Sequence, residues 1–182
     1  MAEWALTAVD QTRYQSATGA ALRAWLAHYL AATEFQELFA KVGNGVDVYL
    51  KDPGLKAGNE LAKPRLILWY ASEEAHPTIF EAPDPQEGDP GHTALFHGSF
   101  VTMTWEVEAT TGPTTGAQLT CMDLLTTVRR ICELHHSDLA AARLLLMPAV
   151  RQSEIVKDDA LNLWHGTLTL EVEIALTGAK VE

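Results

Sequence analysis

Apolar residues recur at helical spacing in two parts of the chain. The first stripe consists of Leu22, Trp25, Leu26, Tyr29 and Leu30. Residues three to four positions apart share one face of a helix, so this stripe predicts a helix over about 16–31. A second stripe follows the capping-box pair Thr115 and Gln118 and predicts a helix that ends near His136.

Strict alternation of apolar and polar residues predicts several strands. The clearest run covers 167–176, and a second covers 99–109, where Val101, Met103 and Trp105 share one face. The segment 64–71 is apolar on both faces, which is typical of a strand that is buried on both sides. Shorter strands are expected at 46–50, 143–147 and 150–156, and the last of these is expected to pair with the final strand across the turn Asp158-Asp159.

The order of these elements predicts the fold class. Strands that arrive in neighbouring runs favour antiparallel pairing, and two helices can cover one side of such a sheet. A chain of 182 residues suits one ordinary domain. We therefore predict a single α+β domain over 1–182, with one mostly antiparallel or mixed β-sheet, two main helices packed on one face, and a long inserted loop.

The inserted loop is expected at about 72–98, where the alternation fails. This stretch contains four prolines, three histidines and six acidic residues, and it contains no Lys or Arg. Long loops inside compact domains are usually functional or mobile, so we expect a mobile acidic loop that contacts a partner. The residues expected at this interface are Glu73, Glu74, Glu81, Asp84, Glu87, Asp89 and His92.

Composition narrows the range of partners. The chain has 24 Asp and Glu against 13 Lys and Arg, which gives a formal net charge of −11. That charge repels phosphate backbones, so sequence-specific binding of nucleic acid through a basic patch is not expected. No long apolar run is present to span a membrane, and the first residues lack the basic and apolar blocks of a signal peptide. We expect a protein that is made in the cytoplasm.

The cysteines and histidines are the first candidates for catalysis or metal binding. Cys121 and Cys132 share one predicted helix, about 16 Å apart along its axis, which is too far for a disulfide. The spacings His-Glu-x-x-His and Cys-x-x-Cys do not occur. His76, His92 and His97 share the acidic loop, which keeps a metal geometrically open there, but solvated loop histidines explain the same pattern. We predict no enzyme activity, no cofactor and no metal.

Four glutamates, Glu106, Glu108, Glu171 and Glu173, lie on the polar faces of the two clearest strands. Paired carboxylates can act as acid and base in glycoside hydrolysis. A sheet face that is solvated or faces another subunit explains the same alternation. The serine in His97-Gly98-Ser99 lacks the second glycine of a nucleophile elbow.

The layout of the whole chain resembles the tail terminator and minor tail (neck-associated) proteins of tailed bacteriophages. An N-terminal amphipathic helix leads to a short strand, a longer pair with a large insertion, a central helix and a final strand through Leu161–Leu170. The resemblance covers most of the chain and rests on size and order, without a signature motif. It carries over no functional residue.

The resemblance implies a virion protein that forms a homo-oligomeric ring, expected to be a hexamer. Such a ring would cap the tail tube protein, stop its polymerisation and join a head-completion or connector protein. DNA would pass through an acidic lumen without sticking. Two alternatives stay open: a head-completion or baseplate structural component, and a small metal-dependent enzyme that uses the histidines and carboxylates of the loop.

Overall fold

The computed structural model describes residues 6–32, 46–50, 64–83, 92–112, 117–147 and 151–181. The helical elements in these ranges are η1 (Gln11–Arg13), α1 (Tyr14–Leu30), α3 (Ala117–His135) and η2 (His136–Ala142). The long strands are β2 (Arg65–Pro83), β3 (Thr93–Thr111) and β7 (Leu163–Lys180). The short strands are β1 (Asp47–Tyr49), β4 (Leu144–Leu146), β5 (Arg151–Gln152) and β6 (Val156–Asp158).

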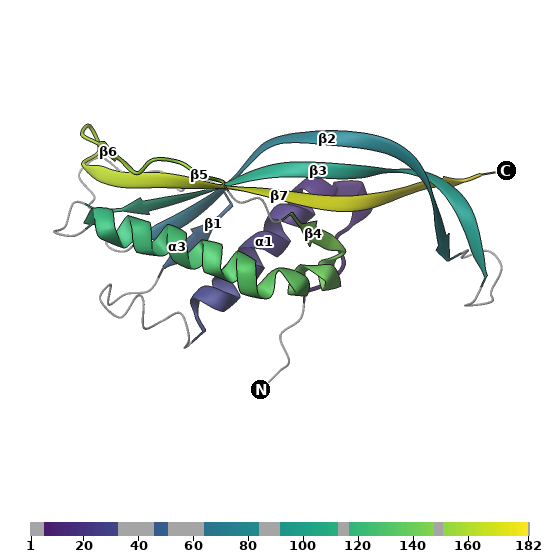
Figure 1. Cartoon of the computed structure of the whole chain (residues 1–182), viewed down its shortest axis with the longest axis horizontal. Coiled ribbons are helices and arrows are strands. Elements are labelled where there is room, and N and C mark those ends of the chain that lie inside the picture. Colours follow the sequence, from purple (N-terminus) through teal and green to yellow (C-terminus); the bar gives the residue numbers. More distant parts are fainter. Residues whose placement is uncertain are drawn as a thin grey trace.

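The described strands form one mixed sheet in the order β1-β2-β3-β7-β4, and β5 and β6 also pair with β7. β1 runs parallel to β2, while the remaining pairs are antiparallel. The helices α1 and α3 lie on the same side of this sheet, as Figure 1 shows. The predicted fold class, a mostly antiparallel or mixed sheet with two main helices on one face, is therefore confirmed.

The core fills the space between the helices and the sheet. Trp25 and Leu26 of α1 and Leu124 and Leu125 of α3 are fully buried, as is Met103 of β3. Full burial of one such side chain is worth about 1.5–3 kcal/mol, so this layer supplies most of the driving force for folding. The alternation of β3 follows from this packing, because every second side chain points at the helices.

The prediction of a loop at 72–98 is wrong for most of that range. Residues 72–83 continue β2 and residues 93–98 begin β3, paired in register from Pro83↔Thr93 back to Arg65↔Thr110. Residues 84–91 lie outside the described residues. A proline such as Pro77 is tolerated here because β3 is the only described strand that pairs with this part of β2, which leaves the other edge free.

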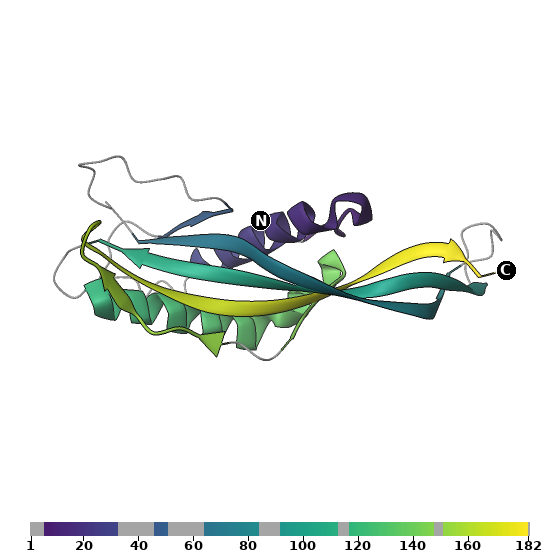
Figure 2. The same cartoon turned by 90° about the horizontal axis from the view of Figure 1, so that it is seen from above.

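The three long strands extend beyond the helices as an arm (Figures 1 and 2). The row that pairs Ala75 with Val101 and Val101 with Ile174 lies at the end of the stretch that β4 covers. Val101 and Ile174 are buried in this row, and farther out Phe96 is buried as well. We define the arm as the rows beyond the Val101 row: 76–83, 93–100 and 175–180. The alternation is lost there because neither α1 nor α3 covers the faces of the arm, as Figure 1 shows. The backbone N–H of Thr177 donates to the Gln11 side chain of η1 at 3.3 Å.

Glycines allow the three strands of the arm to approach and twist. The register between β3 and β7 shifts between Phe96 and Gly98, which marks an irregularity of the bulge type. A Cβ atom on Gly98 would lie 2.3 Å from the carbonyl oxygen of Leu176 and 2.4 Å from the ring of Phe80. Only glycine fits here, and Figure 2 shows the strands twisting across one another in the arm.

Candidate functional site

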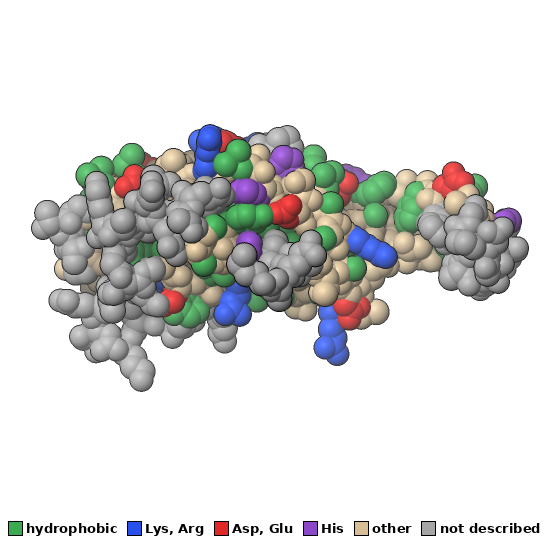
Figure 3. Space-filling model, turned by 90° about the horizontal axis from the view of Figure 1, so that it is seen from below, with side chains coloured by type: hydrophobic (Ala, Val, Ile, Leu, Met, Phe, Trp, Pro, Cys, Tyr) green, Lys and Arg blue, Asp and Glu red, His purple; other side chains and the backbone are tan. Residues whose placement is uncertain are grey.

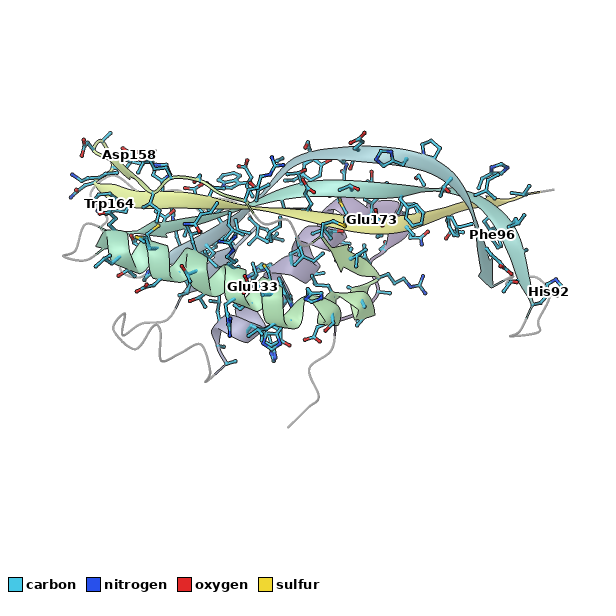
Figure 4. The ribbon with its side chains drawn as sticks, viewed as in Figure 1. His92, Phe96, Glu133, Asp158, Trp164 and Glu173 are labelled. Carbon is cyan, nitrogen blue, oxygen red and sulfur yellow. The ribbon has the colours of Figure 1, made fainter. Side chains whose placement is uncertain are left out.

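The face of the sheet opposite the helices carries a band of glutamates. Alternation along the strands places Glu74, Glu106, Glu108, Glu171 and Glu173 on this face. Each of the four predicted carboxylates of β3 and β7 lies directly opposite a threonine of the other strand, never opposite another acid. This arrangement avoids the closest like-charge contacts, so the band forms an extended acidic surface. Figure 4 shows Glu173 on β7, in the middle of the sheet.

A shallow hollow lies within this band. It is lined by Ser72, Glu73 and Glu74 of β2, Thr102 and Thr104 of β3, and Glu171 of β7. A hydroxyl nucleophile needs a base within hydrogen-bond reach. Within the described part of the chain, the hydroxyls that line the hollow have no hydrogen bond to a histidine or a carboxylate. The hollow therefore offers polar contacts and negative charge, without an assembled nucleophile.

Glu73 and Glu74, which are adjacent in the sequence, point to opposite sides of the sheet. An extra residue in β2 between Tyr70 and Ser72 shifts the register and sets this orientation. Glu73 accepts hydrogen bonds from the Tyr14 hydroxyl at 2.8 Å and from the Gln15 amide at 2.9 Å. Glu73 therefore links α1 to β2. This structural role was not expected, because the sequence placed Glu73 among the interface residues of an acidic loop.

The contacts of Glu73 also perturb its titration. The hydrogen bond from Gln15, helped by those from Tyr14 and Tyr70, lowers the pKa of Glu73. The same contact with Glu73 raises the pKa of Tyr14. Both shifts favour the charged carboxylate beside a neutral phenol, as expected for a structural contact between two elements.

The other predicted interface residues lie at several places, and three of them fall outside the described residues. Glu81 lies on the arm, where the Thr93 hydroxyl donates a hydrogen bond to it. His92 precedes β3 at the tip of the arm, as Figure 4 shows. Glu74 lies on the open face. Asp84, Glu87 and Asp89 lie outside the described residues.

The histidines of the predicted loop are spread along the strands. His76 lies 3.8 Å from Glu74, and both side chains are largely exposed. His97 pairs across the strands with Ile79, on the opposite face of the arm. In the described ranges, no three or more His, Cys, Asp or Glu side chains are grouped closely enough to hold a metal ion. These residues act as separate polar groups of the arm.

A second polar cluster joins the two helices. The ring of Tyr29 stacks on His135 with 3.9 Å between ring centroids, and its hydroxyl donates to Asp138. The indole Nε1 of Trp25 donates to the backbone oxygen of His135 at 3.2 Å. All these contacts link α1 to the end of α3 and the start of η2, so the cluster serves to hold the helices together.

Both cysteines are buried in α3 as free thiols, as the sequence predicts. Burial raises the pKa of Cys121 to about 12, with the nearby charge of Glu108 adding to the effect. Burial likewise raises the pKa of Cys132 to about 12. Because the thiolate is the reactive form, neither thiol is prepared for nucleophilic chemistry.

The apolar surface of the arm is the feature that sequence reasoning missed. Phe80 and Phe96 pair directly across the strands, and Phe80 and Phe100 lie 6.2 Å apart between ring centroids. On the other face, Ile79 and Leu95 are each 53% exposed. The sequence does contain these three phenylalanines and two aliphatic residues, but the prolines and acidic residues around them are typical of a loop. An uncovered apolar arm points to a protein partner.

No helix in the described ranges is both long enough and apolar enough to cross a membrane. Comparison of the sequence with models of known protein families found no match. Comparison with curated proteins found no match either. Any assignment of function therefore rests on the residues and geometry of this chain.

Proposed function

We propose that this chain is a structural virion protein of a tailed bacteriophage: a tail terminator that forms a homo-oligomeric ring. The ring caps the tail tube protein and connects it to the head. The single observation that carries the proposal is the arm, which extends from the body with apolar side chains on both faces (Figure 1). An exposed apolar surface of this kind is typical of a site on which another protein docks.

The layout of the chain supports the same proposal. The resemblance noted above rests on a helix, a short strand, a long strand pair, a central helix and a final long strand. The described elements follow this order as α1, β1, β2–β3, α3 and β7. The insertion of that pattern is, in this chain, an extension of the two strands themselves.

The acidic face of the sheet suits the lumen of such a ring. Five glutamates on one face repel a DNA backbone, so duplex DNA can pass without being held. The threonines between them add hydroxyl groups to this surface, which also carries the exposed Leu145 and the indole of Trp69. The exposed Arg151 of β5 also lies on this face, but the five glutamates outnumber it, so the face stays acidic.

The proposal is tested in the phage that encodes the chain. A nonsense mutation in this gene removes the cap, so we expect filled heads without tails and free tails of irregular, excessive length in electron micrographs. Supplying the wild-type chain from a plasmid should restore joined particles. Normal infectious particles made without the chain would contradict the proposal.

A further inference from the structure

We propose that the arm of one copy docks on the outer face of α3 of a neighbouring copy, so that the ring is joined head to tail. This inference rests on the proposed function, because it names the contact that would build the ring. The partner is a second copy of the chain, as indicated by the shape of the arm, the distribution of charge and the exposed side chains of α3.

The shape of the arm suits a convex partner. Figure 1 shows the tip of the arm bending toward the side of the sheet on which the helices lie. Alternation along β2 and β3 places Ile79 and Leu95 on this concave side, as diagonal neighbours. A concave strand pair that presents two half-exposed aliphatic side chains fits the rounded surface of a helix.

The distribution of charge argues against contact between two arms. The stretch 76–100 holds four acidic residues (Glu81, Asp84, Glu87 and Asp89) and no Lys or Arg, while the third strand of the arm ends at Lys180. An arm laid against the arm of a second copy would bring like charges together, which is unfavourable. An arm laid on a surface that carries arginine avoids this repulsion and gains electrostatic complementarity.

The outer face of α3 provides that surface. Leu134 is 50% exposed, and Arg129 and Arg130 are exposed one turn before it. Both arginines share Glu133, at 3.8 Å and 3.9 Å, so positive charge remains in excess in this half of the helix. An apolar side chain beside unbalanced guanidinium groups matches an arm that presents Ile79 and Leu95 beside Glu81. Figure 3 shows the helix side of the molecule, with the narrow arm extending from the broader body.

Two different surfaces that meet form a heterologous contact, and repetition of such a contact closes into a ring when the rotation allows it. The arm and α3 are separate parts of one chain, so each copy can give an arm and receive one. Two copies that exchange arms reciprocally would instead form a closed dimer, and the size of the assembly distinguishes this dimer from a ring.

The test cross-links the two surfaces in the full chain. One tagged copy carries Leu95→Cys and an untagged copy carries Leu134→Cys, and the mixture is oxidised mildly. The native thiols of Cys121 and Cys132 are buried, so they should not form cross-links themselves. The matched control replaces Leu134→Cys by Leu161→Cys, which has similar exposure outside α3. We expect a tagged–untagged dimer with Leu134→Cys and at most about a tenth as much with Leu161→Cys.

A second variant tests how strongly the same contact holds two copies together. Leu95→Asp should weaken self-association by at least about tenfold, as expected for a central interface residue, and should leave the thermal unfolding of the body unchanged. Rings that form normally with Leu95→Asp, together with no preference for the Leu134→Cys cross-link, would overturn the inference and leave the proposed ring intact. The cross-link in open chains without rings would support the docking and contradict the ring. A wild-type chain that stays monomeric would overturn both.

Discussion

Gly19 allows α1 to lie directly on the indole ring of Trp105. A Cβ atom at this position would lie 2.5 Å from Cη2 of Trp105 and 3.0 Å from Cδ2 of Leu50. Trp105 is buried on the helix side of β3, so its ring has little room to move. At the scale of single residues, close packing of this kind limits which side chains the body accepts.

Gly19→Val should destabilise the fold by about 1–3 kcal/mol, the usual cost of overpacking a core. The control is Ala20→Val, because Ala20 is the next residue of the same helix and its side chain is exposed. Helix propensity favours valine over glycine and disfavours it against alanine, so a larger loss of stability at Gly19 reports the contact with Trp105. Chemical denaturation measures the difference, and equal stabilities would show that α1 does not pack on Trp105 as described.

The two buried thiols give a second prediction at this scale. With a pKa near 12, the thiolate fraction of Cys121 and Cys132 at pH 8 is on the order of a thousandfold below that of a free thiol. A disulfide reagent such as Ellman's should therefore react with neither thiol in the folded chain and with both after denaturation. Rapid reaction of either thiol without denaturant would contradict the described burial.

The same thiols link stability to pH. The unfolded thiols lose their protons near pH 8.5, while the folded ones keep theirs to about 12. The unfolded state then binds fewer protons than the folded state, so stability is kept below pH 8.5 and falls as the pH rises from there toward 12. A variant with both cysteines replaced by alanine should lose this part of the pH dependence.

At the scale of elements, the predictions succeed wherever a strand or helix packs on the core. β3 alternates over Val101, Met103 and Trp105 because one face meets the helices, and this pattern predicted the strand. The outer part of the same strand, Thr93 to Phe100, does not alternate because no helix covers it. Hydrophobic periodicity reports burial, so it could not reveal strands that leave the body.

The candidate site was only partly predictable for a related reason. The sequence identified Glu106, Glu108, Glu171 and Glu173 as one polar surface, and the register of β3 and β7 brings them together. It could not separate Glu73 from Glu74, because their orientation depends on one extra residue in β2. A bulge of this kind is set by tertiary pairing and leaves no periodic signal.

Gly98 gives the prediction for the arm. Gly98→Ala places a Cβ against the Leu176 carbonyl and the Phe80 ring, so β7 should separate from β3 within the arm. Hydrogen exchange should become faster at 176–180 and stay unchanged at 101–109, where the core holds the same strands. The overall free energy of unfolding should change by less than about 1 kcal/mol, because the arm contributes little to the core. Faster exchange throughout β3 would show that arm and body unfold as one unit.

At the scale of the whole molecule, a compact body and a projecting arm have different solubility requirements. The body buries its apolar residues between helices and sheet, while the arm leaves Ile79, Leu95 and Phe100 exposed. The acidic hairpin keeps such a chain soluble before assembly, since like charges oppose association of arm with arm. Both properties suit a subunit whose copies assemble by a directed contact and not by unspecific association of their arms.

The most direct test of this account is native mass spectrometry of the purified chain, combined with negative-stain imaging of the same sample. The account predicts one closed oligomer, expected to be a hexamer, that appears as a ring with a pore wide enough for duplex DNA. Raising the ionic strength should change its stability, because arginines and carboxylates meet in the proposed contact. A chain that remains monomeric at every concentration tested, or forms only two-fold dimers, would contradict the account.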